Sequence, residues 1–151
     1  MKFTPRKINA FLFFKLPSAF LTGVRVKSLS KDTAVVKVTH RWVNQNPFKS
    51  MFWAVQGMAS ELTTGILVMK EIAESNKKIS MLVTNMNGTF TKKATGKIRF
   101  ECNDGELIRT TIQKAIDTGE GQTVTVTSEG FNEEGISVSK FEYEWSLKVK
   151  S

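Results

Sequence analysis

The fold of this chain is decided by residues 50–75, which read SMFWAVQGMASELTTGILVMKEIAES. Apolar side chains recur there at steps of three residues, four residues or their sum, namely at Met51, Val55, Met58, Leu62, Met69 and Ala73. Such spacing keeps one face of an α-helix apolar, and Ser50 has the side chain of an N-cap. The pattern therefore predicts a central helix of about six turns over residues 50–75, with one buried face.

Glu61 lies close to that apolar face. At about 100° per residue the face centres on Met58, and Glu61 lies roughly 60° from the centre. Its neighbours on that side are Ala54, Gly57 and Val68, which would let a sheet approach and leave a narrow slot beside the carboxylate. Burial there would raise the pKa of the carboxylate and make it a stronger base. The alternative is that Glu61 reaches solvent or pairs with a lysine on a facing strand.

Other residues of the same helix have simpler predicted roles. Glu71 and Glu74 lie nearer its C-terminal end and are expected to be solvated. Phe52, Trp53 and Leu67 lie on the side opposite Met58 and need an apolar cover. A second subunit, a fatty chain or the first helix of this chain would provide one. The candidate residues of that first helix are Phe11, Phe13 and Phe14.

The rest of the chain predicts six strands and two shorter helices. Alternating apolar and β-branched residues favour strands over residues 24–27, 34–38, 79–90, 96–102, 122–128 and 135–148. An N-terminal helix is expected within residues 1–17, ending at Pro17, and a short inserted helix over residues 104–118, closed by Gly119. Amphipathic, closely spaced strands and one dominant helix predict an α+β fold. In it a six-stranded antiparallel sheet wraps around the central helix, in a single domain over residues 1–151.

Composition restricts the function. The chain of 151 residues has 22 Lys and Arg against 14 Asp and Glu, a formal charge of +8. The cations are scattered among acids, without a dense basic tract or a glycine-rich phosphate loop, so no nucleic-acid partner is expected. One cysteine and one histidine cannot form a disulfide or a zinc site, so no metal is expected and a cytoplasmic location is favoured. No apolar run is long enough for a transmembrane segment.

Two segments resemble a known family. Residues 46–61, NPFKSMFWAVQGMASE, are similar to the loop and central helix of hotdog-fold acyl-CoA thioesterases, in which a loop asparagine precedes a helical acid by about four turns. Residues 84–96, TNMNGTFTKKATG, resemble the strand pair that follows. The DUF4442 group of thioesterase-like hotdog proteins is the most similar, because it shares the Glu61-Leu62 pair, the inserted helix and an aromatic final strand. The aromatic residues of that strand are Phe141, Tyr143 and Trp145.

The resemblance implies hydrolysis of an acyl-CoA or similar thioester by a homodimer or a dimer of dimers, with the site between subunits and no cofactor beyond the coenzyme A of the substrate. Glu61 would be the general base or nucleophile, and Asn46 would orient the carbonyl or the water. Backbone N–H groups from Phe52 to Ala54 would stabilise the oxyanion, because helix N-termini present free donors. Residues for binding substrate would be Asn87, Lys92 and Lys93, with Lys97 and Arg99 also near the coenzyme A phosphates. Asn87 has the alternative role of a turn or bulge residue beside Gly88.

One departure from the family leaves another function open. Many relatives have His-Gly-Gly at the head of the helix, where this chain has Phe52-Trp53-Ala54. The alternative is therefore a non-catalytic acyl-CoA or lipid-binding hotdog protein, and a protein that serves only for interaction is a third possibility.

Two further residues are weak catalytic candidates. His40 would be the base of a hotdog dehydratase, but it lies beside Arg41 without an acidic neighbour in the sequence. Cys102 has no nearby histidine in the sequence to activate it as a nucleophile.

Overall fold

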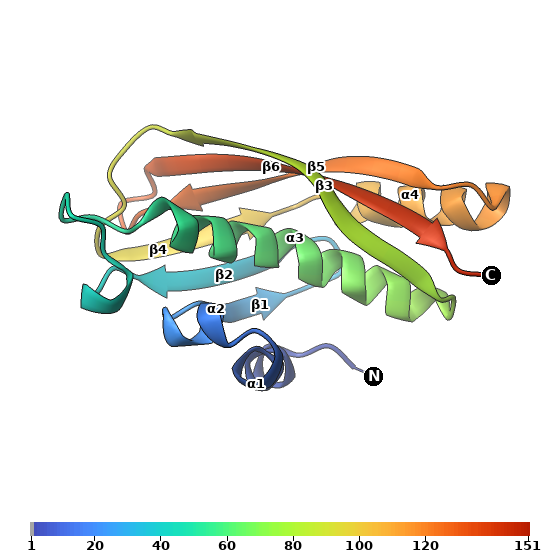
Figure 1. The fold of residues 1–151 in the computed structure, drawn as a ribbon, viewed down its shortest axis with the longest axis horizontal. Helices are drawn as coiled ribbons and strands as arrows, with labels where there is room; N and C mark the ends of the chain where they lie inside the picture. Colours follow the sequence, from blue (N-terminus) through green and yellow to red (C-terminus); the bar gives the residue numbers. More distant parts are fainter. Residues whose placement is uncertain (1) are drawn as a thin grey trace.

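A six-stranded antiparallel sheet curls around one long helix, α3 (Trp53–Ser75), in the computed structural model, which describes residues 2–151 (Figure 1). The strands are β1 (Arg25–Leu29), β2 (Ala34–Thr39), β3 (Ile79–Phe90), β4 (Lys97–Cys102), β5 (Gln122–Phe131) and β6 (Ser137–Val149). They lie in the order β1-β2-β4-β5-β6-β3. The predicted α+β architecture, with the sheet wrapped around a central helix, is confirmed.

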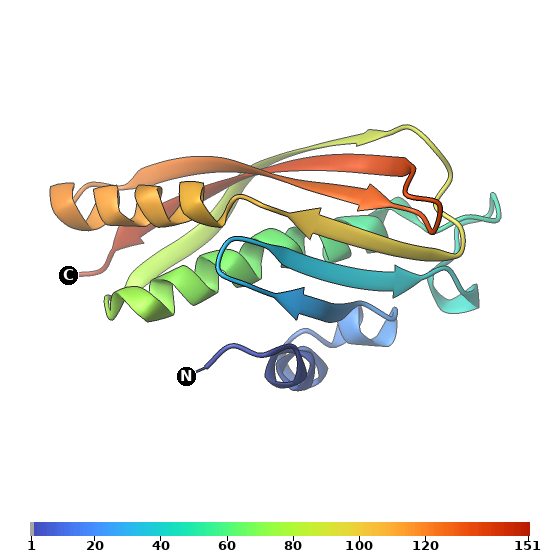
Figure 2. The same cartoon turned by 180° about the vertical axis from the view of Figure 1, so that it is seen from behind.

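Shorter helices lie at the margins of this sheet. They are α1 (Pro5–Lys15), α2 (Pro17–Leu21), the 3-10 turn η1 (Trp42–Asn44) and α4 (Gly105–Thr118). The N-terminal helix ends before Pro17, as expected, because α1 ends at Lys15. Pro17 then begins α2 at the N1 position, where proline loses no hydrogen bond. Viewed from behind, α4 follows β4 at the end of the sheet (Figure 2), and it packs on α3 and β5. None of the helices within residues 2–151 has the length and apolar character to cross a bilayer.

The start of α3 differs from the prediction. Ser50 is not its N-cap, because the helix begins at Trp53 with extended Phe52 in the cap position. Ser50 is instead buried, and its hydroxyl is hydrogen-bonded to the side chain of Asn46. The chain turns sharply just before it, at Lys49, whose φ is 63°. The helix ends at Asn76, which adopts the left-handed conformation common at helix C-termini.

The face of α3 that meets the sheet is only in part the face that the apolar spacing predicted, of which Met51, Val55 and Leu62 are buried in the core. The residues that contact β5 and β6 are largely polar and are hydrogen-bonded to the inner faces of these strands. The pairs are Gln56 with Ser139 (2.7 Å), Ser60 with Tyr143 (2.6 Å), Thr63 with Ser128 (2.8 Å) and Thr64 with Trp145 (3.0 Å). Met58 and Met69 are only partly buried, and Ala73 is exposed. The prediction was wrong for Met58, Met69 and Ala73 because it counted only apolar residues, whereas hydrogen-bonded polar residues are buried equally well.

The side of α3 opposite Met58 also differs from the prediction. Leu67 is fully buried in the core and needs no additional cover. Phe52 and Trp53 remain about half exposed, and the phenylalanines of the first helix do not cover them, because they are exposed themselves. Of the three proposed covers, the structure excludes the first helix of the same chain.

Glu71 was expected to be solvated, and this prediction was wrong. Its side chain is 3% exposed, whereas that of Glu74 is 63% exposed. The Glu71 carboxylate accepts hydrogen bonds from Lys70 (3.2 Å) and from Arg109 of α4 (3.0 Å). Arg109 also binds Asp32 in the turn between β1 and β2 (2.8 Å). This group of charges, of which Lys70 and Glu71 are buried, joins α3, α4 and the first hairpin.

The two edge strands of the sheet, β1 and β3, differ in whether another part of the chain bonds to them. At β1, the side-chain amide of Asn9 in α1 donates to the carbonyl of Val26 and accepts from its N–H, at 3.1 and 2.8 Å. Within residues 2–151 no strand pairs with the outer edge of β3. A 12-residue strand with a free edge offers a template for pairing with another chain.

Candidate functional site

Glu61 lies in the middle of α3, and its side chain is partly buried. Within residues 2–151 its carboxylate has neither a hydrogen-bond donor nor an ion-pair partner. Burial raises the pKa of the carboxyl above its usual value of 4.5. The alternative of a pairing lysine is therefore excluded within this part of the chain.

Two glycines on the same face of α3 make room around this carboxylate. Gly57 and Gly65 lie one turn before and one turn after Glu61. A Cβ added to Gly57 would meet no atom within 4 Å, and one added to Gly65 would lie 3.8 Å from Oε1 of Glu61. A side chain at position 57 would therefore enter open space one turn before the acid.

Tyr143 of β6 contributes a polar group near Glu61 to which the sequence analysis assigned no individual role. Its hydroxyl is hydrogen-bonded to Ser60 (2.6 Å) and donates to the carbonyl of Gly57 (3.0 Å). Burial, with a smaller contribution from the charge of Glu61, raises the pKa of Tyr143 to about 12. The neighbouring hydroxyl is therefore a neutral hydrogen-bonding group. No local pattern reveals it, because its position depends on the register of β6 against α3.

The first turn of α3 presents two free donors. The N–H groups of Trp53 and Ala54 have no acceptor within residues 2–151, whereas the N–H of Phe52 donates to the carbonyl of Asn44 (2.9 Å). Two of the three expected oxyanion donors are thus available, at the positive end of the helix dipole. They adjoin a pocket of about 450 Å³, which is lined by Asn46, Phe52, Trp53, Gln56, Lys92 and Lys93 among others.

Asn46 holds the loop that leads into this helix. Its side-chain oxygen accepts from the N–H groups of Phe48 (2.9 Å) and Ser50 (3.2 Å). Its amide donates to the Ser50 hydroxyl (3.0 Å) and to the carbonyl of Met51 (3.3 Å). These bonds fix the position from which the helix starts, and they use the groups with which Asn46 would contact a substrate.

The expected basic residues separate into two groups. Lys92 and Lys93 lie in the loop between β3 and β4, not on paired strands, and they border the pocket at the helix start. Nζ of Lys93 donates to the carbonyl of Phe48 (3.2 Å). Lys97 and Arg99 instead line a separate groove of about 380 Å³ on the outer face of the sheet.

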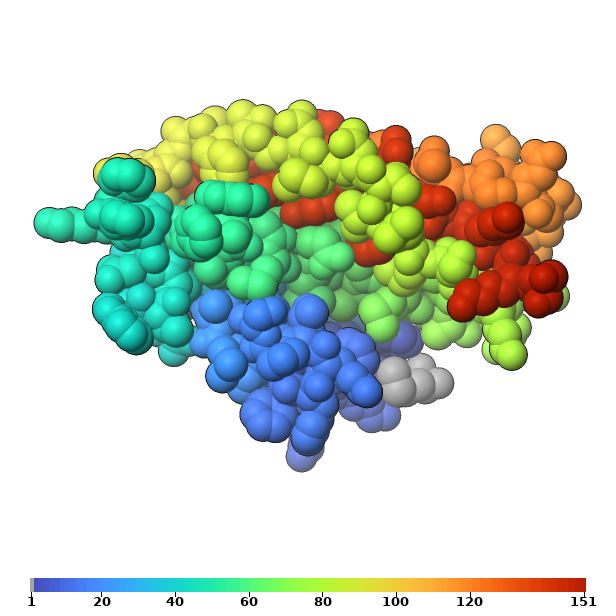
Figure 3. Space-filling view, in the orientation of Figure 1, coloured from blue at the N-terminus to red at the C-terminus, as the bar shows by residue number. Residues whose placement is uncertain are grey.

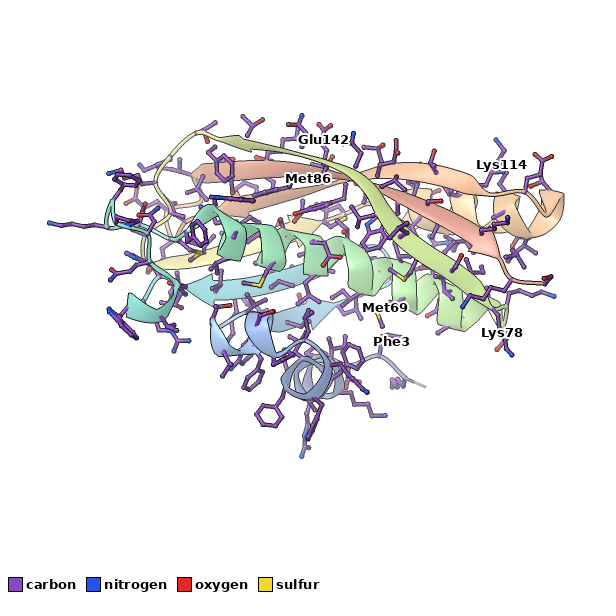
Figure 4. The ribbon with its side chains drawn as sticks, in the orientation of Figure 1. Phe3, Met69, Lys78, Met86, Lys114 and Glu142 are labelled. Atoms are coloured by element: carbon purple, nitrogen blue, oxygen red, sulfur yellow. The ribbon has the colours of Figure 1, made fainter. Side chains whose placement is uncertain are left out.

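Asn87 lies away from the other site residues. It pairs with Glu142 in the register of β3 and β6, and Glu142 lies on the side of the sheet away from α3 (Figure 4). The adjacent Gly88 packs against the ring of Phe141 instead. The structure therefore does not bring Asn87 to the pocket or to Glu61.

Glu61 and the free N–H donors are too far apart to form one site within a single chain. Trp53 and Ala54 precede Glu61 by eight and seven residues, which is about 11 Å along the helix axis. A carbonyl group that undergoes attack needs its nucleophile and its oxyanion donors within about 3 Å, and a general base lies at most one water molecule further away. A complete site would need one of the two elements from another subunit.

The structure also shows the surroundings of the two weaker catalytic candidates, Cys102 and His40. Cys102 is fully buried, and burial raises the pKa of its thiol to about 12, which disfavours the nucleophilic thiolate. Nε2 of His40 is buried without a hydrogen-bond partner among residues 2–151. No cluster of three or more metal-binding side chains occurs in that part of the chain.

Comparison with known proteins identifies the family. The sequence model of one family, described as Domain of unknown function (DUF4442), matches residues 5–147. The chain belongs to the DUF4442 family. Its resemblance to thioesterase-like hotdog proteins is thereby confirmed at the level of the family and the fold. Among curated proteins none matches this DUF4442 chain.

Solved structures share the fold of this DUF4442 protein. A Pseudomonas aeruginosa protein of unknown function, named as a probable thioesterase, has a TM-score of 0.81 at 21% identity, with 97% of each chain covered. A Chlorobaculum tepidum protein of unknown function has a TM-score of 0.82 at 19% identity, with 97% of this chain and 98% of the other covered. A thioesterase from Haemophilus influenzae has a TM-score of 0.73 at 13% identity, covering 99% and 93%. At these identities the similarity establishes the hotdog fold.

Proposed function

We propose that this DUF4442 protein hydrolyses an acyl thioester such as an acyl-CoA, with Glu61 as general base or nucleophile. The observation that carries the proposal is the state of Glu61, a partly buried carboxylate without a partner among residues 2–151, beside open space at Gly57. Keeping a carboxylate in such a place costs stability, and costs of this kind concentrate at functional sites. The names of the similar structures agree with this class of reaction.

In the proposed reaction, Glu61 removes a proton from a water molecule whose oxygen attacks the thioester carbonyl carbon. The carbonyl oxygen becomes negative, and the N–H groups of Trp53 and Ala54 would donate to it. Collapse of the tetrahedral intermediate breaks the C–S bond and releases the thiol with the proton that Glu61 had taken. If Glu61 is the nucleophile, its carboxylate attacks the carbonyl carbon and the C–S bond breaks to release the thiolate. Water then cleaves the mixed anhydride, which restores Glu61 and supplies the proton of the thiol. Neither route needs a cofactor.

We extend the proposal to a homodimer, because the base and the donors lie about 11 Å apart along one helix. Pairing through the free edges of β3 would place two α3 helices side by side, so that each site combines Glu61 of one protomer with the helix start of its partner. Lys92 and Lys93 border that helix start and would bind the phosphates of coenzyme A. A cytoplasmic location is part of the same proposal, since Cys102 is a free thiol.

A specific observation favours a second candidate, a non-catalytic acyl-binding protein. Phe52 and Trp53 stand where many relatives have His and Gly, and their half-exposed rings line the pocket at the helix start. An apolar wall of this kind suits the retention of an acyl chain. The two functions differ in whether thioester bonds break.

The test is hydrolysis of a panel of acyl-CoA thioesters of different chain length. Wild type should turn over at least one of them, and Glu61→Gln should lower kcat/KM by about 100-fold or more, as for loss of a general base. Trp53→Pro removes one free N–H and is compatible with the extended Phe52 (φ −60°, ψ 134°) before it. It should lower kcat by about 100-fold, whereas Trp53→Ala, which keeps the N–H, should not. Binding of acyl-CoA by wild type without turnover would exclude the enzyme and favour the second candidate.

A further inference from the structure

The positive charge of the chain is concentrated in its N-terminal part. Ten of the 22 lysines and arginines but only one of the 14 acids lie within residues 1–60, so this segment carries a formal charge of +9 and the remainder −1. The first acid in the sequence is Asp32. A charge so unevenly placed indicates an anionic partner for one part of the surface.

Exposed apolar side chains lie in the same part of the chain. Ile8 and Leu12 on the inner side of α1 are buried in the core, which explains why they are apolar. Phe14 of α1 is nevertheless 75% exposed, Leu21 of α2 67% and Trp42 of η1 83%. We call these three residues, together with the half-exposed Phe13, the N-terminal patch.

Contacts among α1, α2 and η1 bring together the elements that carry the patch. The ring of Phe13 lies 4.9 Å from that of Phe14 and 5.1 Å from that of Phe20, which precedes Leu21 in α2. The side-chain amide of Asn44 joins η1 to the end of α2 through the carbonyl of Thr22 (2.9 Å). In the space-filling view the N-terminal helices protrude from the body of the molecule (Figure 3).

Cations surround this patch without acidic partners. The guanidinium of Arg25 lies 3.5 Å above the ring of Phe20. Partial burial and, to a smaller extent, the nearby charge of Arg41 lower the pKa of Arg25. Within residues 2–151 no ion pair involves Arg6, Lys7 or Lys15 of α1.

We propose that the N-terminal patch docks this protein on an anionic lipid surface. Phe, Leu and Trp side chains enter the boundary between headgroups and acyl chains, while the flanking lysines and arginines are attracted to acidic headgroups. A tryptophan exposed like Trp42 is typical of side chains at this boundary. The proposal stands independently of the thioesterase proposal.

A second copy of the chain fits the patch less well. Two such surfaces would each bring a dense positive charge into a contact that excludes water, and like charges oppose that contact. The free edge at β3 lies at the other side of the sheet from β1, on which α1 packs. A dimer formed through β3 therefore leaves the patch open to a membrane.

Co-sedimentation of the full chain with lipid vesicles tests the proposal. We expect binding to vesicles of phosphatidylcholine containing about one-third phosphatidylglycerol, and little to phosphatidylcholine alone. Binding should fall at least about tenfold in about 0.5 M salt, which screens the headgroup charge. The double variant Phe14→Ser with Leu21→Ser should lose at least about tenfold in partitioning, because both side chains enter the lipid.

Matched control variants distinguish vesicle binding through the N-terminal patch from non-specific hydrophobic or electrostatic binding. Leu82→Ser removes an equally exposed leucine (65%) from β3, and it should bind vesicles like wild type. Lys15→Gln should weaken binding, whereas Lys114→Gln on the distant α4 (Figure 4) should not. Acrylamide quenching of tryptophan fluorescence should fall when the wild-type protein binds vesicles, but not when the Trp42→Phe variant does.

Three results would overturn the proposal. The first is wild-type protein that does not sediment with the anionic vesicles. The second is an equal loss of vesicle binding in the patch variants and in the control variants. The third is a fall in molar mass by light scattering in the patch double variant without lipid, which would make the patch an interface between copies of this chain.

Discussion

The surroundings of Glu61 disfavour the negative charge of its carboxylate. Burial raises the pKa of Glu61, and within residues 2–151 neither a donor nor a cation offsets the cost. Most buried acids, including Glu71 in the same helix, are stabilised by direct partners. Glu61 therefore has a carboxylate that no group of the described chain engages, whereas the carboxylate of Glu71 is used to hold α3 and α4 together.

The raised pKa predicts how stability changes with pH. The folded chain holds the Glu61 proton to a higher pH than the unfolded chain, whose carboxyl ionises near its usual pKa of 4.5. Glu61 therefore destabilises the fold increasingly as pH rises through 4.5 to the folded pKa, and by a constant amount above it. Glu61→Gln should be more stable than wild type at pH 7 and lose this advantage near pH 4. Urea unfolding of both proteins across this range measures the gap. A gap independent of pH would contradict the assigned pKa direction.

At the scale of elements, α3 is attached to the sheet by hydrogen bonds as well as by apolar contacts. Four side chains of α3 bond to β5 or β6 in the buried layer between helix and sheet. Each bond contributes about 1 kcal/mol when both partners are present, but a buried partner left alone costs more. The attachment is therefore sensitive to single changes.

Thr64→Val tests this attachment. The hydroxyl of Thr64 accepts from Nε1 of Trp145 (3.0 Å), and valine leaves that N–H buried without an acceptor. We expect a loss of about 1–3 kcal/mol in the free energy of unfolding. Thr64→Ser keeps the acceptor and Thr84→Val alters an exposed threonine of β3, so both should lose less. Equal losses in Thr64→Val and Thr64→Ser would show that the hydrogen bond contributes nothing.

The ion pairs of Glu71, which connect α3 to α4, give a second prediction at the scale of elements. Glu71→Ala leaves the buried Lys70 without its nearest carboxylate and removes one partner of Arg109. We expect a loss of about 3–5 kcal/mol, as for breaking a buried ion pair. Glu74→Ala removes an exposed acid of the same helix and should cost under about 1 kcal/mol. Thermal unfolding of both variants measures the difference, and similar costs would contradict the role of Glu71.

At the scale of the whole molecule, the proposed site would combine residues of two protomers. The 11 Å between Glu61 and the free N–H groups follows from the rise of the helix, about 1.5 Å per residue, and no side-chain movement removes it. The edge that would bring two chains together is β3, because Asn9 already occupies the backbone groups of β1 at Val26. Activity and oligomeric state are therefore coupled.

Complementation between two inactive variants tests this coupling. Glu61→Gln keeps the helix start, and Trp53→Pro keeps the acid. After unfolding and refolding an equal mixture, half of the dimers are mixed and each contains one intact site. About one quarter of wild-type activity should return. If acid and donors act within one chain, the mixture stays as inactive as the separate variants. Light scattering should give a mass of two 17.0 kDa chains.

Much of this arrangement follows from local sequence patterns. The central helix, the six strands and the inserted helix depend on residue spacing and turn residues, which act over a few positions. The expectation of open space beside Glu61 also came from local spacing, since Gly57 lies one turn before it. The helix boundary at Ser50 was wrong because the hydroxyl bonds to Asn46 in the loop, which no spacing rule detects.

The sequence by itself determined which elements form and where the unusual acid lies, because helical and strand periodicities are properties of neighbouring residues. Only the tertiary structure decided which face of α3 meets the sheet and which glutamate is held by cations. A polar side chain such as Thr63 or Glu71 is buried at low cost only when its partner arrives from a distant strand or helix. The identity of that partner depends on strand register and helix packing, which the sequence pattern does not specify locally.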